Sequence, residues 1–300
     1  MIKKLFINLE NTLLSNILKR NQSLRNKHKG KNAFLMATGA SLYDKDLTQF
    51  NDDITIGCND IFRHKSFPNL ELNYYVTAAP YRRWRPLRGF THEQHNNYYR
   101  DVDEAFRNRD TIHFHHATMS KYFKKHDLLP DVDSYYFLSK GALLTAKEPL
   151  ADITRPGTFF DGGLMTMIAL AIFMGCKVIY LLGCGYTYSP AQLFHFFDCL
   201  CLPCNLSEEE MLVAKLNFED NNSLCPDFSI LNSKSILCKD GDYRVDYFHY
   251  RNSIKDSPDD WYYQHRLIRS FAQKNGTRIL NIVPSGYESP VYEKSNFVIE

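Results

Sequence analysis

The sequence predicts an α/β fold: a Rossmann-like, mostly parallel sheet with helices on both faces, a lid insertion and an N-terminal amphipathic helix. Short apolar runs recur along the chain, and several of them end at small or polar residues. One stretch, residues 160–188, has the sequence of a complete turn, helix and strand unit. With 300 residues and 44% hydrophobic side chains, the chain can bury a full core in one large domain.

The first two strands are predicted at residues 33–37 and 54–58. The first leads to the small-residue loop Thr38-Gly39-Ala40-Ser41, and the second ends at Asn59. Small residues after a strand let backbone N–H groups approach a phosphate or a ribose. A simple turn has the same composition, so each loop alone is a weak signal for nucleotide binding.

Three more short strands are predicted at residues 72–76, 111–115 and 134–138, and the first of them ends at Thr77. The arginine- and aromatic-rich segment 81–88 follows it. This composition is typical either of a loop that holds a phosphate or an acidic sugar or of a solvated basic loop.

The segment that begins at Phe160 gives the clearest pattern. The turn Asp161-Gly162-Gly163 precedes an apolar run, 164–174, which has the length of a buried helix. Residues 178–182 then form a β-branched run that stops at Gly183 and opens into Tyr186-Thr187-Tyr188. In open α/β sheets ligands bind at the carboxyl ends of strands, so this helix start, Tyr186 and Tyr188 mark a candidate site.

The remaining chain is predicted to hold a lid at about residues 189–245, a helix at 261–274 and a last strand at 278–283 that ends near Ser285. The lid contains the cluster Cys199, Cys201 and Cys204. These thiols are either zinc ligands or, because the surrounding sequence is apolar, small hydrophobic side chains. His113 and His115 fall on one face of their strand without a third ligand, so they do not predict a metal site.

Residues 1–31 differ from the rest of the chain and are predicted to be a separate tail, with one domain at 32–300. The tail carries eight Lys and Arg residues against one acid, Glu10, so its net charge is +7 while the remainder carries −5. Apolar residues recur at helical spacing from Ile2 to Ile17. This composition is typical either of a helix on an anionic membrane or of a helix packed on the domain or on a partner subunit, followed by a basic linker.

Charge and hydropathy limit the classes of protein. A net charge of +2 argues against a general nucleic-acid binder. The longest apolar stretch, 164–180, is interrupted by Gly175 and Lys177, and we identify neither a signal peptide nor a membrane span. We therefore expect a cytoplasmic protein that can lie peripherally on the inner face of the cell membrane; a homo-oligomer is compatible with the sequence.

Four segments within residues 33–297 follow one another in a known order. They are the loop 37–42, the strand end Ile56-Gly57-Cys58-Asn59, the Gly162-Gly163 helix with the strand and loop VIYLLGCGYTY, and the last strand and turn, 279–286. In order and spacing they resemble the family 42 glycosyltransferases, the bacterial sialyltransferases. They also resemble the wider group that contains the motility-associated flagellin glycosyltransferases and the archaeal 6-hydroxymethylpterin diphosphokinase.

The resemblance implies roles for particular residues. Asn59 matches an asparagine that the family uses on the nucleotide, and Tyr188 best matches a tyrosine that holds the departing phosphate. His249 lies in the order expected for the general base, and His195 is the alternative, because the wider group carries a similar histidine there. The chain departs from the family at Thr38 and Ala40 of the first loop. Gly185 also replaces an aspartate, which puts a carboxylate role at that position in doubt.

The sequence therefore predicts a glycosyltransferase that moves an acidic, sialic-acid-like sugar from a CMP-activated donor to a cell-surface glycan. Such a transfer needs a base for the acceptor hydroxyl and stabilisation of the leaving phosphate, but no bound metal or other cofactor. Arg155 is either a partner for the donor carboxylate or a surface charge. The alternatives are an ATP- and Mg-dependent pyrophosphoryl transferase of the pterin diphosphokinase type and a non-catalytic nucleotide-sugar-binding protein.

Overall fold

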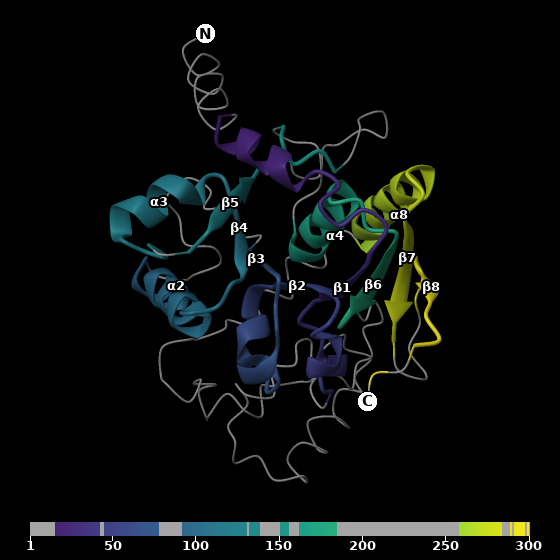
Figure 1. Ribbon diagram of the computed structural model, residues 1–300, viewed down its shortest axis with the longest axis horizontal. Coiled ribbons are helices and arrows are strands. Elements are labelled where there is room, and N and C mark those ends of the chain that lie inside the picture. Colours follow the sequence, from purple (N-terminus) through teal and green to yellow (C-terminus); the bar gives the residue numbers. More distant parts are fainter. Residues whose placement is uncertain are drawn as a thin grey trace.

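The computed structural model of the chain describes residues 16–42, 45–77, 92–130, 132–138, 151–155, 162–184, 258–283, 289, 291–297 and 299. These parts form an α/β fold around an eight-stranded sheet with the order β5-β4-β3-β2-β1-β6-β7-β8, which Figure 1 shows from left to right. Every neighbouring pair of strands is parallel. The predicted α/β class with a mostly parallel sheet is thus confirmed, whereas the predicted lid and most of the predicted N-terminal amphipathic helix lie outside the described residues.

The strands are β1 (Asn32–Met36), β2 (Ile54–Cys58), β3 (Tyr74–Thr77), β4 (Ile112–His116), β5 (Ser134–Phe137), β6 (Val178–Leu182), β7 (Arg278–Ile282) and β8 (Glu293–Lys294). The α-helices are α2 (His92–Phe106), α3 (Met119–His126), α4 (Gly163–Phe173) and α8 (Pro258–Lys274). Short 3-10 helices are η1 (Lys19–Leu24), η2 (Ala40–Leu42), η3 (Thr48–Phe50), η4 (Asn59–Arg63) and η5 (Phe67–Asn69).

Helices cover both faces of the sheet, as the alternation along β1 shows. Ala33 and Leu35 pack in one core cluster with residues of α4 and α8, whereas Phe34 and Met36 pack in a second cluster with residues of α2 and α3. Side chains of a strand point alternately to its two faces, so two clusters separated in this way define two layers of helix. The helix α4 is apolar all round because the sheet, α8 and η1 enclose it.

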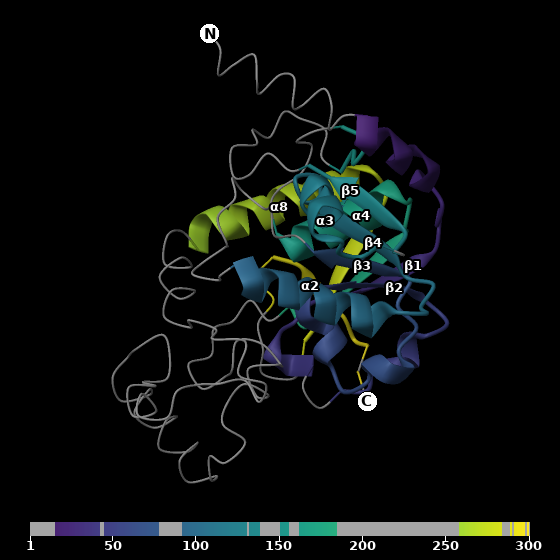
Figure 2. The same cartoon turned by 90° about the vertical axis from the view of Figure 1, so that its left-hand side faces the viewer.

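The residues of η1 and the turns after it are packed on the domain. Leu18, Asn21 and Leu24 are buried, and backbone N–H groups from Asn26 to Gly30 donate to carbonyls at the end of α4. Both views of the ribbon place η1 beside α4 and β5 (Figure 2). Residues 18–30, which were predicted to be a basic segment or linker, are thus packed on the domain. Residues 1–15, which contain most of the predicted amphipathic helix, lie outside the described chain.

Two helices were not predicted. Over its 15 residues α2 buries only the stripe Tyr99, Val102 and Phe106, and its other positions are polar or only partly buried where they are described. The helix α3 is only eight residues long. The strand β3 also begins at Tyr74, not at residue 72. Leu72 is buried in the loop before the strand, and its apolar side chain was wrongly taken as part of the strand.

The predicted lid at 189–245 lies outside the described residues. Within the residues that are described, no helix combines the length and the apolar composition needed to cross a bilayer.

Candidate functional site

The loops after β1 and β6 touch at the carboxyl edge of the sheet. Gly39 N–H donates to the carbonyl oxygen of Gly183 at 3.0 Å. A Cβ on Gly39 would stand 2.8 Å from the carbonyl carbon of Gly183 and closer still to its oxygen, so only glycine permits this approach. The chain runs outward from β1 to β5 and then returns to β6 on the other side of β1. This reversal is the place where open α/β sheets bind ligands.

The amino end of α4 meets the end of β2 beside these loops. A Cβ on Gly163 would lie 3.1 Å from Cys58 Sγ and 3.3 Å from Asn59 Nδ2, so the first turn of the helix packs directly against Asn59. The residue before it, Gly162, has φ +118° and provides no side-chain cap. The first N–H groups of a helix have no intrahelical partner, and they attract anionic groups such as phosphates.

Asn59 has an unusual backbone and a dedicated support. Its φ is +49°, which asparagine tolerates better than most residues. The hydroxyl of Tyr75 donates to the Asn59 carbonyl at 2.7 Å, and it lies 3.3 Å from the hydroxyl of Tyr98. Burial raises the pKa of both tyrosines well above the usual value, so both stay protonated. The hydrogen bond from Tyr75 therefore holds the Asn59 backbone in this orientation.

The loop after β1 forms the short helix η2 and is anchored from two sides. Leu42 N–H donates to Gly39 O at 3.1 Å, and the Leu42 carbonyl lies 2.7 Å from Nε2 of the buried His64. Thr38 is buried, while Gly39 and Ser41 are partly exposed. The loop is therefore rigid, and its exposed side can meet a ligand at the edge of the sheet.

Thr77 lies at the same edge, but its side chain points into the core. Its hydroxyl is hydrogen-bonded to His115 Nδ1, and the residue is 2% exposed. Burial lowers the pKa of His115 well below its usual value and that of His113 to about 3. Both imidazoles are thus neutral, and the Thr77 hydroxyl is engaged inside the fold.

The charged residues described near Asn59 are one arginine and two aspartates, joined by ion pairs. Arg63 contacts Asp60 at 3.0 Å and Asp101 at 3.4 Å. Burial raises the pKa of the Cys58 thiol to about 12 and that of Cys184 well above its usual value, so neither thiol is ionised at neutral pH. Within the described residues, no three His, Cys, Asp or Glu side chains are grouped as metal ligands.

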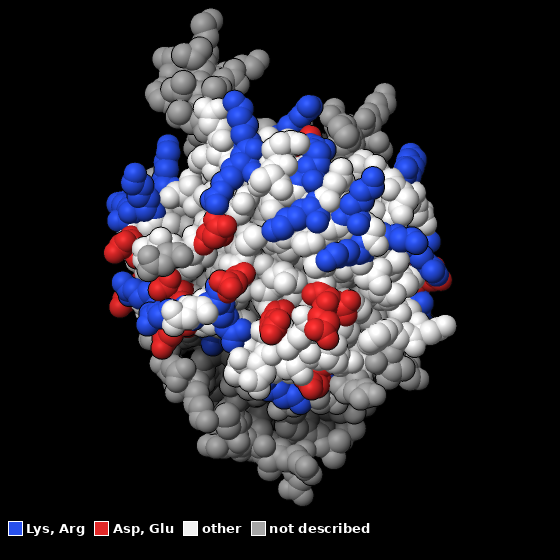
Figure 3. Space-filling view, in the orientation of Figure 1, with Lys and Arg blue, Asp and Glu red and all other residues white. Residues whose placement is uncertain are grey.

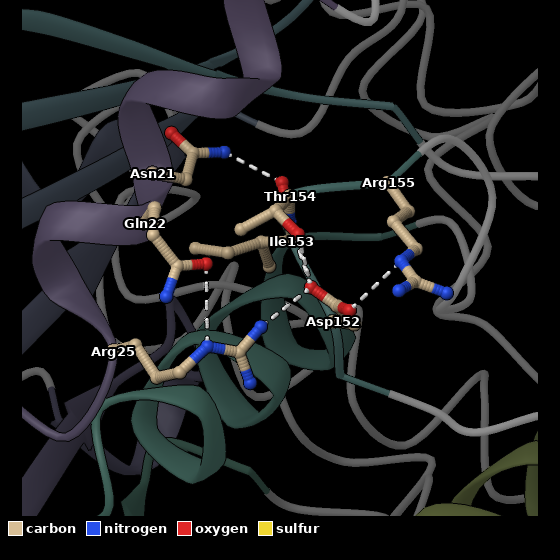
Figure 4. Close-up of polar contacts among 7 residues, drawn as sticks. All are labelled: Asn21, Gln22, Arg25, Asp152, Ile153, Thr154 and Arg155. Atoms are coloured by element: carbon tan, nitrogen blue, oxygen red, sulfur yellow. Dashed lines mark hydrogen bonds and ion pairs between the residues drawn. The ribbon is translucent and has the colours of Figure 1, made fainter.

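Arg155 lies beside η1, away from these loops. Figure 4 shows its guanidinium directed at Asp152, at 3.4 Å, and Asp152 also contacts Arg25 of the segment after η1. The side-chain amide of Asn21, in η1, donates to the Ile153 carbonyl and so holds the segment 151–155 against η1. This ion pair favours the interpretation of Arg155 as a surface charge.

One residue that supports the candidate site was not predicted from the sequence. Asn281 is fully buried in β7, and its side-chain amide donates to the Cys184 carbonyl at 3.1 Å. It thereby holds the chain just after Gly183 in place. The signal was a single asparagine inside an apolar strand, because a buried amide needs partners that only a particular fold supplies.

The structure brings together nine of the predicted residues at one edge of the sheet. They are Thr38, Gly39, Ala40, Ser41, Asn59, Thr77, Gly162, Gly163 and Gly183. Six others lie outside the described residues: Asp161, Tyr186, Tyr188, His195, His249 and Ser285. Gly185 and the cysteines at 199, 201 and 204 lie outside them as well. Comparison of the chain with models of known protein families and with curated proteins found no match.

Proposed function

We propose that the chain is a glycosyltransferase that moves an acidic, sialic-acid-like sugar from a CMP-activated donor to a cell-surface glycan acceptor. One observation carries the proposal. The loops after β1 and β6, Asn59 and the amino end of α4 converge where the strand order reverses. Backbone N–H groups, a side-chain amide and a helix amino end at one place suit a ribose and a single phosphate.

In the proposed mechanism the α4 amino end and the η2 loop bind the donor phosphate, and Asn59 binds the nucleoside. A neutral histidine, His249 or alternatively His195, accepts the proton of the acceptor hydroxyl as that oxygen bonds to the sugar. The bond between the sugar and the phosphate oxygen breaks, and CMP departs. The Tyr188 hydroxyl donates to the phosphate as its negative charge grows.

The charges described at this edge support a single-phosphate leaving group. A pyrophosphoryl transferase that uses ATP and Mg²⁺ needs carboxylates close to the phosphates, since Mg²⁺ prefers oxygen ligands. Among the described residues, the carboxylate that follows Asn59 is Asp60, and it is already paired with Arg63. The described parts of the phosphate-binding loops, residues 38–42 and 162–163, hold neutral residues and no carboxylate.

The test is a thermal-shift series with CMP, UDP, GDP and ATP, each with Mg²⁺ and with EDTA. A ligand that binds only the folded state raises the melting temperature by mass action, by about 5 °C at a hundred times its Kd. We expect the largest shift from CMP, unchanged in EDTA. A shift from ATP that requires Mg²⁺ would favour the pyrophosphoryl transferase instead. Binding of CMP without turnover of any CMP-sugar would favour a non-catalytic binding protein.

A further inference from the structure

The amino-terminal edge of the sheet is strongly basic at β1, β6 and β7. The segments 16–31, 174–178 and 274–278 carry nine Lys and Arg residues and no Asp or Glu. Three of these residues stand side by side at the strand starts, since Lys177 N–H donates to Lys31 O at 2.7 Å and Arg278 N–H donates to Lys177 O at 2.9 Å. Neighbouring strands are about 4.8 Å apart, so the charges form a short row across the edge.

Most of this charge has no acidic partner among the described residues. Arg20, Arg25 and Arg278 form ion pairs with Asp133, Asp152 and Glu293. The other six basic residues form no ion pair within the described chain, and all six are exposed: Lys19, Lys27, Lys29, Lys31, Lys177 and Lys274. A rigid backbone holds them, because residues 26–30 are hydrogen-bonded to the end of α4.

Acidic residues lie on the other half of the same edge. Asp53 precedes β2, Asp110 lies two residues before β4, and Asp133 precedes β5. Figure 3 shows that, on the face it presents, Lys and Arg gather over the upper part and Asp and Glu lie mainly below them. An anionic surface is therefore attracted to the half formed by β1, β6 and β7, with the turns 25–31 before β1, which also fixes the orientation of the domain against it.

We propose that this basic edge, with residues 19–31, docks on an anionic membrane surface and holds the candidate site on the side away from the bilayer. The sequence before η1 favours a membrane over a nucleic acid, since apolar residues recur there at helical spacing from Ile2 to Ile17. β1, β6 and β7 are five residues long, so the site lies at least about 17 Å beyond the docked edge. The proposed membrane docking does not depend on the glycosyl transfer proposed above.

The first test is binding to vesicles of phosphatidylcholine with about one third phosphatidylserine, measured by sedimentation. We expect Lys31→Gln/Lys177→Gln to weaken binding about 30-fold, because each basic residue near such a surface contributes about a factor of five. The matched control Arg100→Gln/Lys121→Gln removes the same charge from α2 and α3 and should retain binding within about threefold. Melting temperatures of both variants check that the fold is intact. Equal binding by the two variants would overturn the proposal.

The second test separates the folded edge from the preceding segment. A chain lacking residues 1–17 keeps the buried Leu18, Asn21 and Leu24 and should still bind anionic vesicles, more weakly and with a strong dependence on salt. Loss of all binding would show that the edge has no affinity of its own. Binding of the full chain to duplex DNA more tightly than to the vesicles, at the same salt concentration, would also overturn the membrane assignment.

Discussion

Replacing Gly39 with alanine tests whether the loops after β1 and β6 are in contact. The added methyl group would stand 2.8 Å from the carbonyl carbon of Gly183 and closer to its oxygen, well inside van der Waals contact. The obstacle is backbone, so it cannot rotate away as a side chain would. The two loops must separate, and the 3.0 Å hydrogen bond between them is lost.

The expected cost has two parts. Overpacking a rigid site costs about 1 to 3 kcal/mol, and the lost hydrogen bond adds about 1 kcal/mol. We therefore expect Gly39→Ala to lower the free energy of unfolding by about 2 to 4 kcal/mol and to weaken nucleotide binding as well. Gly276→Ala is the control, since its Cβ would meet nothing within 4 Å and only its φ of +74° causes strain, which costs about 1 to 2 kcal/mol.

Urea denaturation of the wild type and both variants measures these differences. The midpoint should fall further for Gly39→Ala than for Gly276→Ala, with the same slope m, because the unfolded surface is unchanged. A Gly39→Ala protein as stable as the Gly276→Ala control would show that the two loops are not in contact. The proposed phosphate site would then lose its geometric basis.

Three further predictions concern single side chains. Tyr75→Phe removes the hydrogen bond that orients Asn59 and should raise the Kd for CMP by about two- to tenfold, with a melting temperature close to that of the wild type. Burial lowers the pKa of His113 to about 3, so between pH 6.5 and about 3 the histidine is protonated in the unfolded chain but not in the folded protein. The free energy of unfolding should therefore fall by about 1.4 kcal/mol for each unit by which the pH is lowered in this range. His113→Phe should reduce that pH dependence, measured by urea denaturation at several pH values. His249→Ala should cut turnover at saturating donor by about 10²- to 10⁴-fold, whereas near-normal turnover there with collapse in His195→Ala would identify the other histidine as the base.

Seven of the eight strands were predictable because each is a short, largely apolar run near turn residues, whereas the exposed strand β8 was not predicted. Six of the seven predicted strands begin and end within one residue of the observed ones, and only β3 begins two residues later than expected. The helix α2 was missed because its buried stripe, Tyr99, Val102 and Phe106, is too narrow to give an apolar pattern. Burial there is determined by the sheet beneath the helix, which local sequence does not describe.

The site was predictable as separate loops, not as one arrangement. Glycines after strands mark turns wherever they occur, but the contact of Gly39 with Gly183 exists only because β6 pairs with β1. That pairing joins segments far apart in the chain and follows from the strand order. Tyr75 has the composition of a core residue, and its support of the Asn59 carbonyl depends on the same long-range packing.

Calorimetric titration of CMP in EDTA, with the wild type and two asparagine variants, tests the central claim most directly. Asn59→Ala should weaken CMP binding at least tenfold, because the proposed hydrogen bonds between its side-chain amide and the nucleoside are lost. Asn108→Ala removes the same side chain from another left-handed position, φ 65°, in the exposed turn after α2, and should bind CMP as the wild type does. Equal CMP affinity in the two variants, or no CMP binding by the wild type, would contradict the assignment of the nucleotide site to this edge of the sheet.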